Sequence, residues 1–554
     1  MDRIVTSSNG PQIQRKPILP YWWVVAALLA VMATLQFTSM RMESQTADEG
    51  RQLISGYTYL ISGHFTVARE HPPLLKLLWA IPVWFLHPDP PHDGDAWHAA
   101  VDFLYSNRVP ADQLLLAGRC SAIAVSVLLG LAIAFWAKRH FGERVALFSV
   151  FLYAADPNFL ANGRYIKNDV GAALAIFAGT MTWGSYLIQP TRKRLCLSGI
   201  VLGLALTVKN SAMILWPVLL LLYIVRCWQE RRTFEAGPLL RRLCTVAVIA
   251  FLVIFCVYGF EIEPAGSSSE FVRIFPSWMD QVPLPAMAYF ESLGNLSLRQ
   301  VGRALEVSFL LGDQSPTGWW YMTPVALAVK TPLAELILFV LVLWIGLRRL
   351  RTVRPRDLEF RWYLLMVPTA CYLVAALMSH SNVGERHLLP LYPFLFVFSA
   401  AVLLAQPLPK WRALTVAAAG LLLVIETAMI HPHYLAFFNV LAGGPAGGRR
   451  YLVDSNLDWG QDLKNLKKYL DDHHIPEVCL SYYGWAPVEY YGIRYRELPA
   501  VPQIEDAASL DCVAAVSVTH LATQYEKLAG LDELRPDARI GYSIYVYDLR
   551  KAAR

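Results

Sequence analysis

Charged residues are scarce in this sequence. Only 17% of its 554 residues are Asp, Glu, Lys or Arg, whereas 55% are hydrophobic and the chain holds 17 Trp, 26 Tyr and 25 Phe. A soluble domain of this length could not bury so much apolar surface. The composition therefore excludes an ordinary soluble protein and predicts a polytopic membrane protein.

A continuous basic surface is also missing, although Lys and Arg (49) outnumber Asp and Glu (43) and give a net charge of +6. The basic residues come in short clusters between apolar runs, and this pattern does not favour nucleic-acid binding. It is typical of membrane proteins, in which Lys and Arg gather in the cytoplasmic loops.

Metal and nucleotide motifs are absent as well. The eight cysteines show no metal-ligand spacing, and six lie in or beside apolar segments, so neither a zinc site nor a disulfide framework is indicated. Cys479 and Cys512 share the C-terminal region and could pair in an oxidising compartment, but two free thiols are the expectation. Because a Gly-rich phosphate loop and a Rossmann fingerprint are both missing, no ATP or nucleotide-sugar site is expected.

Eleven apolar stretches suit membrane-spanning helices. A helix needs about 20 apolar residues to cross a bilayer, and shorter helices are tolerated inside a bundle. The sequence predicts spans at 21–39, 112–136, 145–160, 168–188, 195–208, 210–225, 243–260, 322–347, 362–380, 388–405 and 413–430. The expected fold class is an α-helical polytopic membrane module over residues 21–430.

A twelfth apolar stretch, Pro72 to Leu86, is assigned from loop charge. If it crossed the membrane, four basic clusters would face outward against the positive-inside rule. These clusters are Lys138-Arg139, 192–194, 226–242 and 348–361. We therefore expect Pro72 to Leu86 to lie in the interface or to re-enter. Residues 1–20 are then cytoplasmic, and the loops 40–111 and 261–320 face outward.

The region after residue 430 changes character, because apolar runs shorten and charge rises. Strand-like pieces occur at 478–483, 513–518 and 542–547, and leucines recur at helical spacing at Leu463, Leu466 and Leu470. The sequence predicts a small soluble α/β domain over 431–554 on the outer face, joined by a flexible Gly-rich segment at 443–448.

Adjacent carboxylates, Asp48 and Glu49, follow the first predicted span in a net-acidic outer loop. In a glycosyl transfer, a carboxylate can accept the proton of the attacking hydroxyl or stabilise positive charge at the anomeric carbon, and a phosphate leaving group needs no strong general acid. Two acids in a water-facing loop could equally be only solvated. They could also bind a divalent cation, although no ligand spacing identifies one.

Other polar groups gather at the outer ends of the predicted spans. Glu70 and His71 precede two prolines, so they either form a polar turn or bind phosphate, metal or sugar. Arg164, Lys167 and Asp169 lie before the fourth span. Asp169 could be only a helix cap, but charge at the membrane edge is expensive, and the three residues together indicate a polar cavity.

Cations lie at three further positions. Lys209 interrupts an apolar run between the fifth and sixth spans, and Lys330 lies about two turns into the eighth. Each could bind a lipid phosphate or simply extend to the membrane surface. Arg386 and His387 follow Gly384 in the link before the tenth span, which suits bidentate phosphate binding or a plain polar turn.

Together these motifs resemble the GT-C superfamily of membrane glycosyltransferases, and specifically its protein O-mannosyltransferase-like branch (glycosyltransferase family 39), which also includes the bacterial aminoarabinose transferases. The similar residues are Asp48-Glu49, His71-Pro72-Pro73-Leu74, Arg164 with Asp169, Lys209, and Arg386-His387-Leu388-Leu389-Pro390. Each motif is weak, but their order and spacing over about residues 20–430 make the resemblance fairly specific.

The resemblance implies an inverting transferase in the bacterial cytoplasmic membrane. It would take a sugar from a polyprenyl-phosphate donor on the outer face and pass it to a protein, lipid or glycan acceptor. Family precedent makes Asp48 the base, with Glu49 and Asp169 lining the site, and makes Lys209 and Arg386 candidates for the donor phosphate. The alternatives are a lipid flippase or transporter, which would place charges nearer mid-bilayer, and a membrane-anchored sensor or scaffold.

Two stretches have no counterpart in that pattern. Pro88 to Pro110, rich in Pro, His and Asp, looks like an insertion in the first outer loop. The motif Asp454 to Asp462 is similar to the tails of uncharacterised bacterial members and not to the sugar-binding tail of eukaryotic mannosyltransferases. The sequence assigns a role to neither stretch, and it identifies neither the sugar nor the acceptor.

Overall fold

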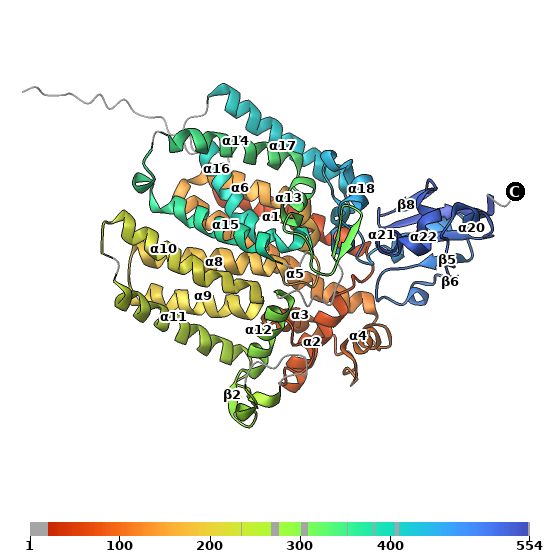
Figure 1. Cartoon of the computed structure of the whole chain (residues 1–554), viewed down its shortest axis with the longest axis horizontal. Helices are drawn as coiled ribbons and strands as arrows, with labels where there is room; N and C mark the ends of the chain where they lie inside the picture. Colours follow the sequence, from red (N-terminus) through yellow and green to blue (C-terminus); the bar gives the residue numbers. More distant parts are fainter. Residues whose placement is uncertain are drawn as a thin grey trace, which may run out of the picture.

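The computed structural model describes residues 20–551 except 93, 234, 268–275, 301–307, 352, 380–382 and 405–408. The described chain forms a helical module followed by a small α/β unit, which lies at one end of the helices (Figure 1). The N-terminus expected in the cytoplasm, 1–20, lies almost entirely outside the described residues.

Eight helical segments of the described chain are long and apolar enough to cross a membrane. They are α1 (Tyr21–Arg41), α5 (Ala111–Phe141), α8 (Asp169–Ile188), α10 (Leu215–Gln229, after the turn Asn210–Ile214), α11 (Ala236–Val257), α15 (Phe360–Met378), α16 (Tyr392–Leu404, after turns that begin at Glu385) and α17 (Lys410–Ile430). Each coincides with a predicted span, and the expected fold class is confirmed.

The predicted span 145–160 is broken in two. α6 (Glu143–Ala155) ends at Asp156, and α7 (Pro157–Asn162) begins directly after it. The Asp156 carboxylate accepts hydrogen bonds from the backbone amides two and three residues further on, so it caps a new helix. Pro157 occupies the first position of that helix, where its missing N–H costs nothing.

The prediction of a single span over 322–347 is wrong, because the structure has two helices there. The chain forms α13 (Met322–Lys330) and α14 (Leu333–Leu350), which are bent relative to each other by 116°. The break falls at Pro332, because proline cannot donate to the preceding turn and disfavours a helical residue before it. The described residues thus hold eight candidate spans, or nine if the bent pair is one span. The shorter helices α6 and α9 (Arg192–Val208) complete the eleven predicted stretches.

The first loop, between α1 and α5, contains α2 (Glu49–Ser62), α3 (Leu74–Trp84) and α4 (Ala96–Tyr105). α3 has 11 residues and is therefore about 16 Å long, roughly half the thickness of a bilayer core. It packs tightly on α2, since a Cβ at Gly56 would lie 2.0 Å from the backbone oxygen of Lys76. Its length suits the interfacial or re-entrant helix expected here.

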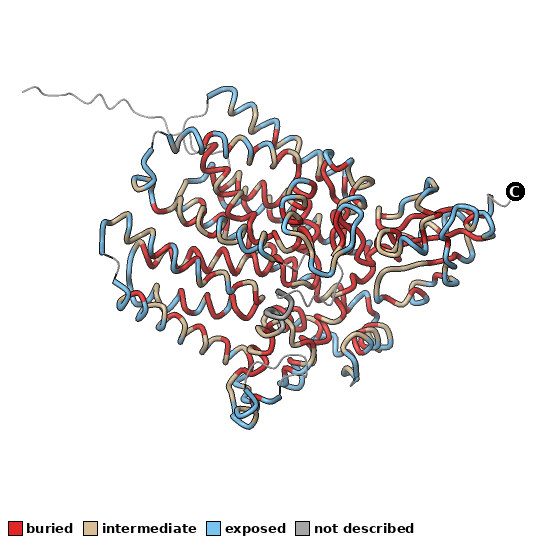
Figure 2. Tube along the Cα trace, in the orientation of Figure 1, coloured by how far each residue is buried: buried red, intermediate tan, exposed pale blue. Residues whose placement is uncertain are grey.

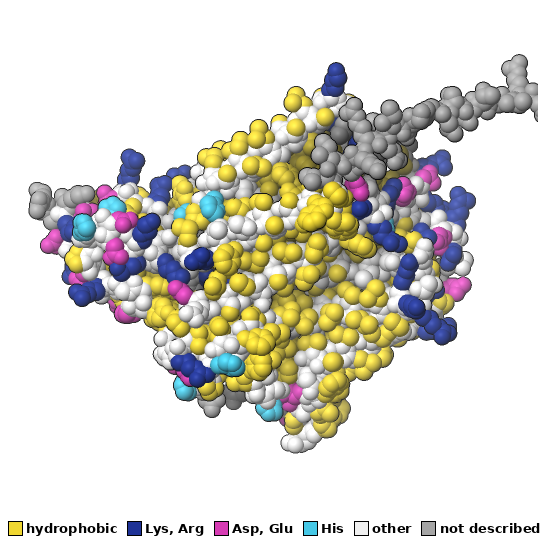
Figure 3. All heavy atoms as spheres, turned by 180° about the vertical axis from the view of Figure 1, so that it is seen from behind, with side chains coloured by type: hydrophobic (Ala, Val, Ile, Leu, Met, Phe, Trp, Pro, Cys, Tyr) yellow, Lys and Arg dark blue, Asp and Glu magenta, His cyan; other side chains and the backbone are white. Residues whose placement is uncertain are grey.

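The helical module has buried central helices and an apolar outside. α8 and α16 are its most enclosed spans, with 72% and 78% of their apolar windows buried, whereas α11 has 17%. Figure 2 shows the same layering along the trace. A broad hydrophobic surface crosses the middle of the module, and charged side chains gather at both ends (Figure 3). This is the surface of an integral membrane protein.

The C-terminal unit is a five-stranded sheet with the strand order β6-β5-β7-β9-β8. Its elements are α19 (Leu463–Asp472), β5 (Val478–Ser481), β6 (Tyr495–Glu497), α20 (Ile504–Ala508), β7 (Val513–Ser517), α21 (Val518–Thr523), α22 (Tyr525–Asp532), β8 (Ala538–Ile540) and β9 (Ile544–Asp548). β5 is parallel to β6 and β7, and the other pairs are antiparallel. The predicted strands correspond to β5, β7 and β9, and the leucine pattern forms α19.

The remaining short elements lie in two connecting regions. They are β1 (Ile262–Pro264), β2 (Pro283–Pro285), α12 (Met287–Gln300), β3 (Ser308–Leu310), β4 (Asp313–Ser315) and α18 (Gly444–Gly447). The Gly-rich segment expected to be a flexible linker is folded, because it forms α18 and its last residue, Gly448, is buried against Phe438. Residues 434–462 are not strands of the sheet. They are hydrogen-bonded both to the helical module, through Lys330, and to the C-terminal unit, through Thr519 and Ser543.

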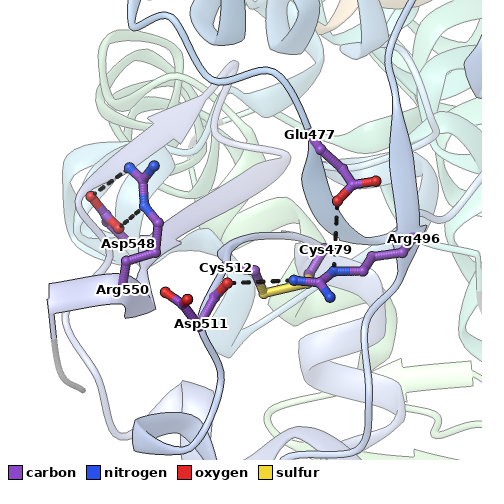
Figure 4. Close-up of a disulfide and its surroundings, with 7 residues drawn as sticks. All are labelled: Glu477, Cys479, Arg496, Asp511, Cys512, Asp548 and Arg550. Atoms are coloured by element: carbon purple, nitrogen blue, oxygen red, sulfur yellow. Dashed lines mark hydrogen bonds and ion pairs between the residues drawn. A yellow bond between two sulfur atoms is a disulfide. The ribbon is translucent and has the colours of Figure 1, made fainter.

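Cys479 of β5 and Cys512, which precedes β7, form a disulfide (Figure 4). The expectation of two free thiols is therefore wrong. The sheet register places Cys479 opposite Ala514, so the Cα atoms of the two cysteines are only 6.2 Å apart. Sequence spacing could not reveal this proximity, because it depends on which strands are neighbours. Figure 4 also shows Arg496 beside the disulfide, where it bonds the Asp511 carbonyl.

Candidate active site

A cavity of about 320 Å³ lies beside the starts of α2, α4 and α8. Its walls come from α2, α4, α13 and α15, from the start of α8, and from the links before α3, α10 and α16. Seven of the ten site residues expected from the sequence line it: Asp48, Glu70, His71, Asp169, Lys209, Arg386 and His387. The other three, which do not line it, are Glu49, Arg164 and Lys330.

Asp48 precedes the first residue of α2 and faces two cations. Lys167 Nζ contacts its Oδ2, and Arg386 Nη1 lies 3.4 Å from the same oxygen. Burial would raise the pKa of Asp48, but the charges of Lys167 and Arg386 outweigh burial and lower the pKa to about 2. Asp48 is therefore an ionised carboxylate at neutral pH.

Asp169 and Lys209 form a second ion pair on the same cavity. Lys209 Nζ donates to Asp169 Oδ1 at 2.5 Å. Asp169 is the first residue of α8, where the positive end of the helix dipole also stabilises its charge. Asp169 thus lines the cavity from the first turn of α8, whose N-cap residue is Asn168 and has no side-chain cap hydrogen bond.

Arg51 and Glu70 form a third pair, with an N–O distance of 2.9 Å. Arg51 lines the cavity and was not expected from the sequence. A signal did exist, because Arg51 follows Asp48 by three residues, the spacing that places side chains on one face of a helix. His71 lies beside Glu70 on the cavity wall.

The insertion-like stretch contributes one wall of the cavity through Trp97 of α4. The Arg51 guanidinium carbon lies 4.8 Å from the centre of the Trp97 ring. On the C-terminal unit, Trp485 stacks on Trp97 with ring centres 4.9 Å apart and planes 16° from parallel. The insertion and the C-terminal unit therefore meet at the cavity. Nothing in the sequence marked Trp97, because aromatic residues are common in this chain.

Part of the cavity wall is apolar. It is formed by Met213 and Ile214 before α10, Met322 and Ala326 of α13, and Ala376 of α15. The cavity thus combines ion pairs with an apolar surface, which suits an amphiphilic ligand that has an anionic head.

Glu49 is turned away from the cavity and is fully buried against Arg119. Two contacts join them, from Arg119 Nη2 at 2.6 Å and from Nε at 2.8 Å. The backbone amides of Thr46 and Ile166 also donate to Glu49. Burial would raise the pKa of Glu49, but Arg119 and these hydrogen bonds lower it below its ordinary value. Glu49 therefore does not line the site with Asp48, contrary to expectation, and supports the loop before α2.

Arg164 is also held outside the cavity. Its side chain is completely buried, and it forms an ion pair with Glu43 at 2.5 Å. A further hydrogen bond of 2.8 Å runs to the backbone oxygen of Leu160 in α7. Arg164 thus fastens the first loop to the end of α7, and the expectation that it binds substrate is not supported by its position.

Lys330, the third such residue, fastens the segment that follows α17. Its Nζ donates to the backbone oxygens of Leu435, Phe437 and Asn456 at 3.0, 2.6 and 2.8 Å. Because three carbonyls already surround the ammonium group, Lys330 is placed to support the chain and not to bind a ligand in the cavity.

Trp459, in the motif that the sequence left without a role, lies beneath the charged end of the cavity. Its side chain is 2% exposed. The Arg386 guanidinium carbon is 4.7 Å from the centre of its ring, and Lys167 Nζ is 5.5 Å from it. Trp459 therefore contacts both of the cations that hold Asp48.

The divalent cation left open by the sequence has no evident ligand set. In the part of the chain that the structure describes, no group of three or more His, Cys, Asp and Glu side chains is arranged to hold a metal ion.

Comparison with known proteins agrees with this architecture. The sequence model of the family described as dolichyl-phosphate-mannose-protein mannosyltransferase matches residues 25–263, a range that includes Asp48, Asp169 and Lys209. A comparison with curated proteins found no match.

Two solved structures share the fold. The crystal structure of ArnT from Cupriavidus metallidurans bound to undecaprenyl phosphate is 14% identical, with a TM-score of 0.50 over 95% of this chain and 98% of that one. The crystal structure of the Archaeoglobus fulgidus oligosaccharyltransferase in the apo form is 13% identical, with a TM-score of 0.50 over 92% of this chain and 71% of that one. These comparisons agree with the resemblance found in the sequence: residues 25–263 match the model of the protein mannosyltransferase family, and the whole chain shares the fold of the two solved structures.

Proposed function

We propose that the protein transfers a sugar from a polyprenyl-phosphate-linked donor to an acceptor hydroxyl, with Asp48 as the base. The observation that carries the proposal is that Asp48 shares one cavity with Lys167, Lys209, Arg386 and an apolar wall. A lipid-linked donor needs cations for its phosphate and an apolar surface for its lipid, and the acceptor needs a carboxylate for its proton. The undecaprenyl phosphate bound to ArnT, which shares this fold, supports the choice of donor.

In this reaction the acceptor oxygen attacks the anomeric carbon on the face opposite the phosphate. A bond forms between that oxygen and the carbon while the bond from the carbon to the phosphate oxygen breaks, and the electron pair leaves with the phosphate. The proton of the acceptor hydroxyl passes to Asp48, which later releases it to water. The products are polyprenyl phosphate and an acceptor that carries the sugar with inverted configuration.

Donor binding would prepare the base. Lys167 and Arg386 keep the pKa of Asp48 at about 2, so its carboxylate is a weak proton acceptor before a donor binds. A donor phosphate competes for the same two cations. Once they bind the phosphate, the pKa of Asp48 rises toward its ordinary value, and the cations stabilise the charge that develops on the leaving group.

We place this cavity and residues 431–554 on the outer face of a bacterial cytoplasmic membrane. The Cys479–Cys512 disulfide supports an oxidising compartment for the C-terminal unit. The basic cluster at the end of α5, which includes Lys138 and Arg139, fits the opposite, cytoplasmic side.

The proposal is tested with purified protein, a panel of polyprenyl-phosphate sugars and a cell-envelope fraction that supplies acceptors. We expect release of polyprenyl phosphate from at least one donor, and a loss of about 10²-fold or more in the Asp48→Asn variant. Asp471→Asn is the matched control, because Asp471 lies on the exposed side of α19 and away from the cavity. Turnover retained in Asp48→Asn would refute the assignment of Asp48 as the base. Absence of turnover with every donor would refute the proposal that the substrate is lipid-linked.

A further inference from the structure

The motif Asp454 to Asp462 is tied to the loop that carries Asp48. The backbone amide of Ala47 donates to the carbonyl of Trp459 at 2.9 Å, and that of Ser44 donates to the carbonyl of Gln461 at 2.8 Å. Two backbone hydrogen bonds therefore set the position of the residues just before Asp48. Side-chain changes elsewhere in the motif would leave these bonds in place.

The same motif is tied to the loop that carries Arg386. Asn456 Oδ1 accepts a hydrogen bond of 2.9 Å from the amide of Glu385, and its Nδ2 donates to the carbonyl of Val383 at 3.0 Å. Gly384, between these residues, has a φ of +93°, and a Cβ there would lie 2.2 Å from Asn456 Oδ1. One short peptide thus positions both the acid and one of its cations, although they are 338 residues apart in sequence.

The ring of Trp459 lies between these two ties, against Arg386 and Lys167. An aromatic face attracts a cation through its quadrupole but carries no net charge. A second carboxylate in that place, added to Asp48, would further neutralise the two cations and compete with an anionic ligand. The ring can therefore hold Arg386 and Lys167 in place while their positive charge remains available to a phosphate.

We propose that Trp459 is a positioning residue for the transfer, which uses its ring face to hold Lys167 and Arg386 at the spacing that receives the donor phosphate. The inference rests on the proposed function. It also assigns a role in the site to the C-terminal motif, which lies outside the family match at 25–263.

The first test compares Trp459→Phe with Trp459→Leu, and measures the binding of undecaprenyl phosphate and the KM for the active donor. Phenylalanine keeps an aromatic face, whereas leucine fills part of the volume without one. We expect affinity for undecaprenyl phosphate to fall about tenfold in Trp459→Leu and only about two- to threefold in Trp459→Phe. Trp411→Leu is the matched control, because Trp411 is half exposed at the start of α17 and does not line the cavity.

A second test keeps the volume of the ring and does not depend on the folding of Trp459→Leu. Mono-, di- and trifluorotryptophan incorporated only at position 459 progressively weaken the negative face of the indole. We expect the affinity for undecaprenyl phosphate to fall stepwise with each fluorine. A residue that merely fills the core would give the same affinity across the series.

The outcomes separate this inference from the proposed function. If the parent protein neither binds undecaprenyl phosphate nor uses a lipid-linked donor, both proposals fail. If the parent binds it and the fluorinated series is flat, or if Trp459→Phe loses as much affinity as Trp459→Leu, only the role of Trp459 is overturned. A stepwise loss in a parent that turns over the donor supports both.

Discussion

Glu49 and Arg119 form a completely enclosed ion pair directly beside the cavity residue Asp48, with Nη2–Oε2 and Nε–Oε1 distances of 2.6 and 2.8 Å. Arg119 also donates to the backbone oxygens of Ser44 and Met40 at 2.7 and 3.0 Å. The pair therefore fixes the loop between α1 and α2, and this loop in turn directs Asp48 into the cavity.

Glu49→Gln should consequently destabilise the protein, whereas Asp48→Asn should mainly abolish activity. The first change leaves the Arg119 guanidinium buried without a countercharge, which costs about 3–5 kcal/mol. Asp48 is partly open to the cavity, and asparagine keeps a polar oxygen facing Lys167 and Arg386, so we expect its replacement to cost less stability than Glu49→Gln. Thermal unfolding in detergent measures the difference. Equal melting temperatures for the two variants would contradict the separate roles of these adjacent acids.

In the free enzyme, protonation of Asp48 should cause no loss of kcat/KM above pH 4, so the pH profile should have no acid limb from this residue there. The pKa of Asp48 is lowered from 3.8 to about 2, so the carboxylate stays ionised until the pH falls toward 2. Because the pKa of Asp48 is lower in the folded than in the unfolded protein, its ionised carboxylate stabilises the fold above about pH 4. This contribution is lost as the pH falls through the folded-state pKa. The profile of kcat/KM against pH reports this group in the free enzyme.

Lys167→Met should shift that acid limb upward. Removing a cation that contacts Asp48 raises the pKa of the carboxylate by about one pH unit or more. The same variant should weaken donor binding, since Lys167 is one of the cations offered to the phosphate. An unchanged acid limb together with a normal fold would show that Lys167 does not control the ionisation of Asp48.

Site residues that lie at helix ends could be predicted from the sequence. Asp169 and Lys209 stand at the ends of apolar runs, and the alternation of such runs places these ends on one side of a membrane. The direction of a side chain at a helix end could not be predicted. Asp48 and Glu49 are neighbours at the start of α2, yet one faces the cavity and the other faces Arg119, because consecutive helical residues point in different directions.

Contacts between segments that are distant in the sequence could not be predicted either. The partners of Lys330 are backbone oxygens 105 to 126 residues away, and a carbonyl has no side-chain signature. Nothing in the sequence distinguished Trp459 from other aromatic residues of a soluble tail. Only the fold shows that its ring lies against Arg386. The pairing of Cys479 with Cys512 depended on sheet order in the same way.

Lys330→Met should loosen the segment after α17. Methionine keeps the apolar stem but leaves the carbonyls of Leu435, Phe437 and Asn456 without a donor, which should cost at least about 2–3 kcal/mol. Hydrogen exchange of residues 435–456 should become faster. Lys468→Met, on the exposed side of α19, is the matched control. Unchanged exchange in Lys330→Met would show that the ammonium group does not hold this segment.

Removing the Cys479–Cys512 disulfide should destabilise the C-terminal unit and leave the helical module intact. The bond closes a loop of 33 residues, and the loss of such a cross-link is worth about 3–4 kcal/mol through the entropy of the unfolded chain. The paired Cys479→Ala and Cys512→Ala replacement should therefore make β5 and β7 accessible to protease before α1 to α17. Mass spectrometry after alkylation of protein isolated from intact cells checks the bond itself. Free thiols at both positions in correctly inserted protein would contradict the disulfide and would remove its support for an outward-facing C-terminal unit.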